Sequence, residues 1–203
     1  MKTDIILSGV GGQGILTIAA GLDTAALSED LFIKQSEVHG MSQRGGAVQS
    51  HVRISDKEIF SDLIPEGQAD LILSVEPMEL LRYTPFLKKD GWLVTDSESF
   101  VNTANYPERN DLFDQIKKHP NHVIVNATEI AKTIGNSKIA NMVLLGAASA
   151  IIPLSENSLI EAIRKLFQHK SERVIKLNLE AFYEGKNVAE GITDVVANKQ
   201  IQE

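Results

Sequence analysis

The feature that most constrains the fold is a glycine-rich turn at residues 9–14, directly after a short apolar run at residues 5–7. The run has no polar alternation, which is typical of a parallel strand covered by helices on both faces. The turn has the spacing G-x-G-x-x-G, and its glycines let backbone N–H groups approach an anion at the start of a helix. Residues 15–27 are rich in Ala, Leu and Ile, as that helix requires. A strand–turn–helix unit is therefore predicted.

The rest of the chain alternates predicted strands and helices. Strands are expected at residues 31–34, 48–55, 69–75, 92–95 and 122–126, the first completing a βαβ unit, and an edge strand at residues 59–64. Helices are expected at residues 77–87, 111–118, 128–134, 142–152, 155–167 and 170–184. Asn141 is the predicted N-cap of the helix at 142–152, and Ser155 is the predicted N-cap of the helix at 155–167. Residues 88–91 are predicted to end the helix at 77–87. A surface excursion with a small hairpin is expected between residues 97 and 109. We predict a Rossmann-like three-layer α/β/α fold with a mostly parallel sheet and a helical C-terminal region.

Composition limits the class of protein. A chain of 203 residues with 43% hydrophobic residues suits one domain, with a core over about residues 1–152, a helical region over about 153–190 and a tail at 191–203. No apolar segment is long enough to span a membrane, and no signal peptide precedes the first strand, so a cytoplasmic location is expected. The net charge of −7 argues against a nucleic-acid surface. The absence of cysteine excludes cysteine-ligated iron–sulfur clusters within this chain.

The glycine turn allows three interpretations. A nicotinamide or flavin site needs an acidic residue about 20 positions after the turn to hold a ribose hydroxyl, and Glu37 is near that place. A second interpretation is that another phosphate-bearing ligand binds at the turn. In the third, the glycines serve only the tight turn and helix packing. The residues concerned are Gly9, Gly11, Gly12, Gln13 and Gly14.

A second polar cluster occupies residues 36–46, which are predicted to form a long loop at the carboxyl end of a strand, where α/β proteins usually bind ligands. Its candidate residues are Ser36, Glu37, His39, Ser42, Gln43, Arg44, Gly45 and Gly46. Arg44 before two glycines offers a positive fork beside open backbone amides, which suits a carboxylate or phosphate. His39 is a candidate for proton transfer near neutral pH. The alternative is structural: Arg44 pairs with Glu37, and His39 is a hydrogen-bonded framework residue.

Other chemistries find less support. The five histidines, His39, His51, His119, His122 and His169, lack metal-ligand spacing, so no metal site is predicted. There is no G-x-S-x-G elbow and no thiol for nucleophilic catalysis. Glu76, between a strand end and Pro77, is a candidate ligand-facing or interface carboxylate. Its alternative role is a charge at a helix N-terminus.

Two long motifs, GVGGQGILT at residues 9–17 and SEVHGMSQRGG at residues 36–46, resemble the gamma-type domain of 2-oxoacid ferredoxin oxidoreductases. Within this family, the motifs look similar to those of the beta subunit of indolepyruvate ferredoxin oxidoreductase. Residues 61–77 (SDLIPEGQADLILSVEP) and 141–147 (NMVLLGA) also resemble this family, so the similarity extends over nearly the whole chain.

The resemblance implies a subunit rather than a complete enzyme. Family members convert a 2-oxoacid, such as an arylpyruvate, and coenzyme A into an acyl-CoA, carbon dioxide and reduced ferredoxin. Thiamine diphosphate, Mg and 4Fe-4S clusters are expected in the partner alpha subunit and none in this chain, which has no G-D-G-type metal-binding segment. The isolated chain is therefore expected to be inactive. By motif, residues 9–14 and 36–46 become the ones expected to shape the substrate or coenzyme A approach, with catalytic candidates His39, Arg44 and Glu37.

Overall fold

The computed structural model describes residues 1–39 and 46–200, with side chains for residues 1–37 and 46–191. Its centre is a six-stranded sheet in the order β2-β3-β1-β4-β5-β6. The strands are β1 Lys2–Val10, β2 Phe32–His39, β3 Ala47–Ser55, β4 Ala69–Ser74, β5 Leu87–Asp96 and β6 His122–Val125. β1, β4, β5 and β6 are parallel neighbours, whereas β3 is antiparallel to both β1 and β2. This mixed, mostly parallel sheet confirms the predicted fold class.

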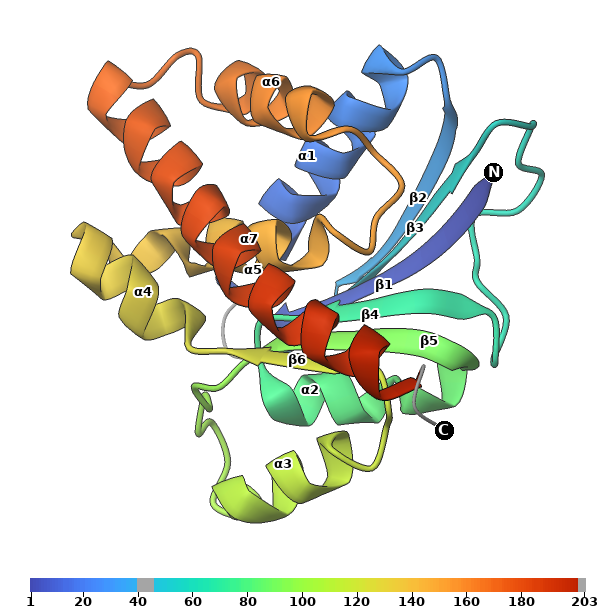
Figure 1. Cartoon of the computed structure of the whole chain (residues 1–203), viewed down its shortest axis with the longest axis vertical. Helices are drawn as coiled ribbons and strands as arrows, with labels where there is room; N and C mark the ends of the chain where they lie inside the picture. The colour runs from blue at the N-terminus through green and yellow to red at the C-terminus, as the bar shows by residue number, and fades with distance from the viewer. Residues whose placement is uncertain (40–45, 201–203) are drawn as a thin grey trace.

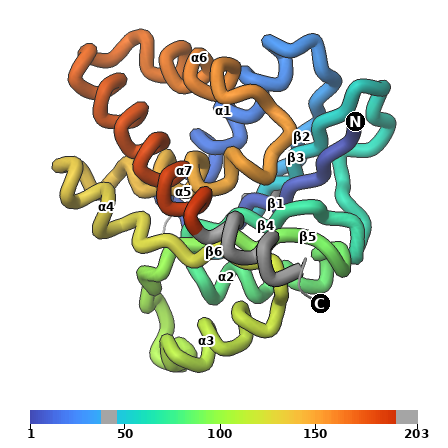
Figure 2. The backbone as a smooth tube through the Cα atoms, in the orientation of Figure 1, coloured from blue at the N-terminus to red at the C-terminus, as the bar shows by residue number. Residues whose placement is uncertain are grey.

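Helices cover both faces of the sheet, as Figure 1 shows. The helices are α1 Ile15–Ser28, α2 Pro77–Arg82, α3 Arg109–Ile116, α4 Ala127–Ile134, α5 Ala140–Ala148, α6 Glu156–Leu166 and α7 Glu172–Gln200, with short 3-10 helices at Thr84–Phe86 and Ser137–Ile139. α2 and α3 lie on one side of the sheet, and α1, α5, α6 and α7 on the other (Figure 2). The three predicted layers are therefore present.

The hydrophobic core has two parts, one on each face of the sheet. The larger part is filled by side chains of α1, α5, α6 and α7 packed on the sheet, and by short residues such as Ala19, Ala25 and Ala147 that let these helices approach closely. The smaller part packs α2 and α3 on the other face through Ile6, Ile72, Leu80, Leu93 and Ile116, with Ile64 and Ala69. Both faces of β1 are thus covered, as its unbroken apolar sequence predicts.

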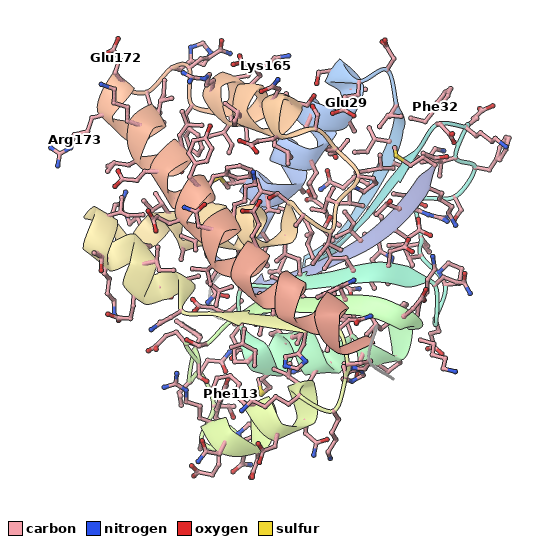
Figure 3. All side chains as sticks on the ribbon, viewed as in Figure 1. Glu29, Phe32, Phe113, Lys165, Glu172 and Arg173 are labelled. Atoms are coloured by element: carbon pink, nitrogen blue, oxygen red, sulfur yellow. The ribbon has the colours of Figure 1, made fainter. Side chains whose placement is uncertain are left out.

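Backbone contact between α5 and α7 fixes the second helix layer. A Cβ added to Gly146 would lie 1.9 Å from the carbonyl oxygen of Phe182, and one added to Gly185 would lie 1.8 Å from that of Val143. Glycine is therefore required at both positions by space. At the other side of the layer lies Glu29, which follows α1 and is labelled in Figure 3. It accepts a 2.7 Å hydrogen bond from the N–H of Ser155, the N-cap of α6.

Several boundaries differ from the sequence predictions. Residues 36–39 belong to β2 and are not loop, because they pair with β3 from Ser36 opposite His51 to His39 opposite Val48. Residues 59–64 form no strand, and residues 88–91 lie within β5 instead of ending a helix. Residues 97–108, where a hairpin was expected, contain no strand, and α7 continues through Gly191 to Gln200, where the sequence suggests a tail. No described helix is both long and apolar enough to cross a membrane.

Candidate functional site

A cavity of about 520 Å³ opens at the carboxyl ends of the parallel strands, beside the glycine turn. The turn supplies Gly12, Gln13 and Gly14, and the facing wall comes from α4, α7 and the segment between α4 and α5. Its lining includes Thr17, Val75, Asp96, Thr128, Asn136, Ser137, Lys138, Ile139, Ala140, Asn141, Phe167, Val174 and Asn178. This is the edge at which open α/β sheets bind ligands. A hollow of ligand size thus lies beside the turn, and ligand binding there stays a prediction.

Hydrogen bonds within the glycine turn, and one to Gly46, fix its conformation. The Val10 N–H donates to Gln13 Oε1 at 2.7 Å, and the Gln13 N–H donates to the Val10 carbonyl at 3.2 Å. The Gly11 N–H donates to the Gly46 carbonyl at 2.9 Å, which joins the turn to the start of β3. The Gln13 side chain is thus hydrogen-bonded within the turn. Gly46 is the residue of the second polar cluster with a described backbone contact to the turn.

Three glycines of the turn, Gly9, Gly12 and Gly14, differ in what surrounds them. A Cβ on Gly9 would lie 2.3 Å from Val75 Cγ2, so Gly9 makes room for the residue that follows β4. Gly14 has φ +83° and caps α1, and a Cβ there would lie 2.5 Å from Asn141 Nδ2. Gly12 has φ +100°, is exposed, and has no atom within 4 Å of an added Cβ. Gly12 is therefore where the turn faces open space.

Asn141 joins the turn to α5. Its Nδ2 donates to the Gly14 carbonyl at 3.1 Å across 127 residues of sequence, and its side chain is buried. Asn141 is thus a residue of α5 that holds the glycine turn. The prediction that it is the N-cap of this helix is wrong, because α5 begins at Ala140, two residues before the predicted start, with Ile139 as its N-cap.

Asp96 forms the floor of the cavity at the end of β5. Its carboxylate accepts hydrogen bonds from the N–H groups of Ala127 and Thr128, each at 3.1 Å, and from the Glu98 N–H and the Thr128 hydroxyl. Burial raises the pKa of Asp96, and these donors act in the opposite direction by favouring the charged form. The carboxylate therefore fixes the start of α4, and sequence reasoning missed it because both partners lie more than thirty residues away.

The sheet order separates the predicted ribose ligand from the turn. Glu37 lies opposite Ser50 in β3, and Ser50 lies opposite Leu7 in β1. With β3 between them, β2 and β1 are two strand spacings apart, about 9–10 Å. In a dinucleotide fold the acidic residue follows the strand adjacent to the glycine turn. Glu37 has the expected spacing in sequence but not the expected neighbour in space.

The chain matches the model of the pyruvate ferredoxin/flavodoxin oxidoreductase family over residues 4–188. It is 37% identical to the indolepyruvate oxidoreductase subunit IorB of Archaeoglobus fulgidus, over 93% of this chain and 96% of that one. The chain belongs to this family. The Thermococcus kodakarensis IorB subunit is also 37% identical, over 92% and 95% of the two chains. Among solved structures, the gamma subunit of a keto/oxoacid ferredoxin oxidoreductase from Geobacter sulfurreducens PCA has a TM-score of 0.72 at 27% identity, over 94% and 98% of the chains.

In this oxidoreductase family member, the second motif cluster is only partly described. Ser36 and Glu37 lie in β2, and Gln35 Nε2 donates to both Glu37 Oε1 and Ser50 Oγ. The candidates Ser42, Gln43, Arg44 and Gly45 lie outside the described residues, and the His39 side chain does too. Nearby, burial and the charge of Glu37 raise the pKa of Asp23 to about 6.

The other candidates have structural partners. Glu76 is the N-cap of α2, accepting a 2.8 Å hydrogen bond from the Glu79 N–H, and Tyr106 donates its hydroxyl hydrogen to the second carboxylate oxygen. Burial raises the pKa of this fully buried carboxyl group, and the Tyr106 bond opposes the rise. His51 Nδ1 accepts from the Ile64 N–H at 3.0 Å, and burial and Arg53 lower the pKa of its ring. Among the described residues, no cluster of His, Cys, Asp or Glu suits a metal ion.

Proposed function

We propose that this chain is the IorB-like, gamma-type subunit of a 2-oxoacid ferredoxin oxidoreductase that acts on indolepyruvate or another arylpyruvate. The observation that carries the proposal is similarity to IorB subunits at 37% identity over nearly the full length of both chains. In the proposed complex, an alpha subunit holds thiamine diphosphate, Mg and 4Fe-4S clusters, coenzyme A is the co-substrate, and ferredoxin receives the electrons. The chain has no cysteine with which to ligate a cluster itself.

The reaction assigned to the complex is an oxidative decarboxylation. The bond between the carboxylate carbon and the keto carbon breaks and releases carbon dioxide, and the keto carbon then forms a thioester with the sulfur of coenzyme A. The electron pair of the broken bond leaves to ferredoxin, and the thiol proton is released. Thiamine diphosphate, when bound by the partner, supplies the electron sink for the decarboxylation.

The contribution assigned to this chain is one wall of the coenzyme A approach. The cavity beside the glycine turn is open at Gly12, where a phosphate can approach the backbone at the start of α1. Lys138 stands exposed in the same lining and supplies a cation for that phosphate. At its end, the second motif is joined to this wall, since the Gly46 carbonyl accepts a hydrogen bond from the Gly11 N–H. Catalytic roles for His39, Arg44 and Glu37 remain proposals, to be tested by substitution in the complex.

A free-standing nicotinamide or flavin enzyme is the alternative that the glycine spacing suggests. The antiparallel strand β3 between β1 and β2 argues against it, because it moves Glu37 away from the turn. Tight NADH or FAD binding that Glu37→Ala weakens would support this alternative. A non-catalytic module that binds a phosphate ligand is the other one, and it predicts ligand binding without activity in any complex.

The test is to co-express the chain with the alpha subunit from the same organism and assay viologen reduction with indolepyruvate and coenzyme A. We expect activity from the complex and none from the isolated chain; activity of the isolated chain would contradict the proposal. Lys138→Gln should raise the KM for coenzyme A roughly fivefold or more by removing a charged hydrogen bond, and should leave the KM for indolepyruvate unchanged. Lys170→Gln, another exposed lysine outside the cavity, is the matched control.

A further inference from the structure

The connection between β3 and β4 displays two large apolar side chains to solvent. Phe60 is 86% exposed and Leu63 is 55% exposed, whereas Ile59 and Ile64, at the two ends of the same six-residue segment, are 8% and 2% exposed. We call residues 59–64 the apolar arch. A single exposed apolar residue is ordinary on a protein surface. Here, however, the chain buries the two ends of the arch and turns an entire phenylalanine outward.

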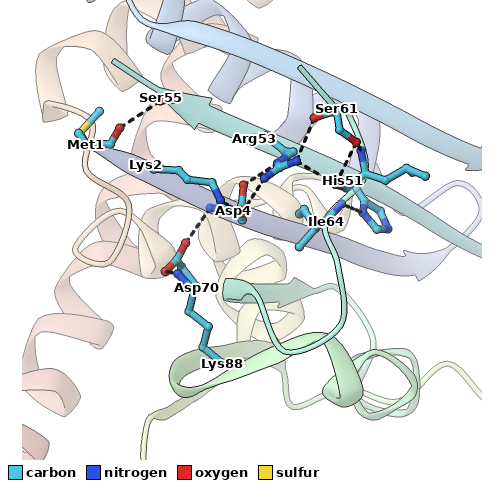
Figure 4. Close-up of polar contacts among 11 residues, drawn as sticks. Met1, Lys2, Asp4, His51, Arg53, Ser55, Ser61, Ile64, Asp70 and Lys88 are labelled. Carbon is cyan, nitrogen blue, oxygen red and sulfur yellow. Dashed lines mark hydrogen bonds and ion pairs between the residues drawn. The ribbon is translucent and has the colours of Figure 1, made fainter. Parts of the chain in front are cut away.

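A buried ion pair beneath the arch fixes its shape (Figure 4). Arg53 Nε and Nη2 donate to the two carboxylate oxygens of Asp4 at 2.8 and 3.2 Å. The remaining Arg53 nitrogen, Nη1, donates to the carbonyl oxygens of Ser61 and Leu63 at 3.0 and 2.9 Å. Three nitrogens of one guanidinium group thus join β1, β3 and the arch.

The arch has a second attachment to the sheet. The Ile64 N–H donates to His51 Nδ1 at 3.0 Å, and the edge of the His51 ring packs on Phe86 with 5.7 Å between centroids. A buried ion pair is costly to desolvate and is weak evidence for added stability. Its evident effect here is conformational: the backbone that follows Phe60 is held at Ser61, Leu63 and Ile64 before any partner arrives, which lowers the ordering cost of binding.

Charge on the connection indicates what kind of surface would cover the arch. Four of the five charged residues between positions 56 and 68 are carboxylates, and three of these, Glu58, Asp62 and Glu66, are exposed around Phe60 and Leu63 in sequence. Apolar anchors within an acidic rim complement an apolar pocket with a basic rim. A second copy of this chain fits poorly, because a two-fold contact would bring the same acidic rims together.

We infer that the apolar arch is a docking surface for the larger, alpha subunit of the complex, inserting Phe60 into an apolar pocket rimmed by Lys and Arg side chains. The inference rests on the proposed function for the identity of the partner. Phe60 is the anchor, Leu63 extends the buried area, and the surrounding carboxylates steer the approach of the partner. Arg53 positions these residues and does not itself contact the partner.

The test measures the Kd and association rate of the wild-type chain and its variants with the alpha subunit from the same organism. Phe60→Ser should raise the Kd by about tenfold or more, as for a central apolar anchor, and Leu63→Ser by less. Both variants should unfold at the wild-type temperature, because the substituted side chains are exposed. The double variant Glu58→Gln/Asp62→Asn should associate more slowly and show a weaker dependence on salt. In the complex, backbone amides of the arch should gain protection from hydrogen exchange.

Leu27→Ser is the matched control, since Leu27 is 62% exposed on α1 and should leave the Kd unchanged. If the wild-type chain assembles and Phe60→Ser binds equally well, or Leu27→Ser is equally weakened, the docking inference is overturned and the proposed function stands. If the wild-type chain self-associates through Phe60 instead, the assignment of the partner is wrong. If the wild-type chain forms no complex with the alpha subunit, the proposed function fails and the inference fails with it.

Discussion

Substituting Gly14 with alanine tests how the glycine turn is built. Gly14 lies in the left-handed region at φ +83°, where an alanine costs about 1–2 kcal/mol. The added Cβ would stand 2.5 Å from Asn141 Nδ2, so the amide must move and lose its 3.1 Å hydrogen bond to the Gly14 carbonyl. Asn141 is buried, and an unsatisfied buried donor costs about 1–3 kcal/mol. Part of the total is offset by the lower entropy of alanine in the unfolded chain, about 0.4–1 kcal/mol.

We therefore expect Gly14→Ala to lower the free energy of unfolding by about 2–3 kcal/mol, measured by urea denaturation. Gly12→Ala is the matched control, because Gly12 also has positive φ, at +100°, but nothing lies within 4 Å of its added Cβ. Its cost should be conformational only, about 1 kcal/mol. The difference between the two variants isolates the contact with Asn141.

A double-mutant cycle separates the clash from the backbone strain. In an Asn141→Ala background the Gly14 Cβ has lost its obstacle, so Gly14→Ala should cost no more than Gly12→Ala does in the wild-type chain. The coupling energy between Gly14 and Asn141 should be about 1–2 kcal/mol, within the range for residues in direct contact. Equal costs for Gly14→Ala and Gly12→Ala, or no coupling between Gly14 and Asn141, would refute the claim that contact with Asn141 requires glycine at position 14.

Two further predictions concern packing and pH. Gly185→Ala should lower the free energy of unfolding, measured by urea denaturation, by about 3 kcal/mol or more, because the added Cβ would meet the Val143 carbonyl and push α5 away from α7. Gly191 is the control, since it lies on the same helix with open space around an added Cβ. Gly191→Ala should raise the free energy of unfolding by about 0.5–1 kcal/mol. The pKa of Asp23 is raised from 3.8 to about 6, so the folded chain keeps a proton that the unfolded chain releases, and stability falls as pH rises through that window. Asp23→Asn should remove this slope and be more stable than the wild type at pH 8 but not at pH 4, by urea denaturation at each pH; an unchanged slope would contradict the raised pKa.

Local signals in the sequence were sufficient for much of the fold. An apolar run followed by glycines predicts β1 and the start of α1, and Ser155 before a helical pattern predicts the cap of α6, where its Oγ accepts from the Ser158 N–H at 3.1 Å. Gly135 ends α4 in the left-handed region, as its place after Ile134 suggests. In each case the residues that determine the structure are within a few positions of one another.

Features set by distant contacts could not be predicted in this way. Three of residues 36–39 are polar and a glycine follows them, a pattern that indicates a loop, yet these residues pair with β3 and form a strand. The insertion of β3 between β1 and β2 depends on strand pairing, which no local pattern encodes. Asn141 has the right residue type and position for a helix cap, but its side chain satisfies the Gly14 carbonyl instead. For residues 59–64 the sequence predicts an edge strand, whereas hydrogen bonds from the distant Arg53 hold the backbone of this segment in a different conformation with Phe60 and Leu63 exposed.

The G-x-G-x-x-G spacing is therefore satisfied for reasons that are mostly internal to the fold. Val75 leaves no room for a side chain at Gly9, and Asn141 leaves none at Gly14. Packing therefore accounts for two of the three fingerprint glycines without a ligand. Gly12, which the fingerprint does not require, is the glycine that faces open space beside the cavity. If a ligand binds at the turn, its specificity must come from residues across the cavity, such as Lys138 between α4 and α5 and Asn178 in α7. A dinucleotide fold obtains that specificity from the end of its second strand, so the same glycine spacing does not by itself imply the same ligand.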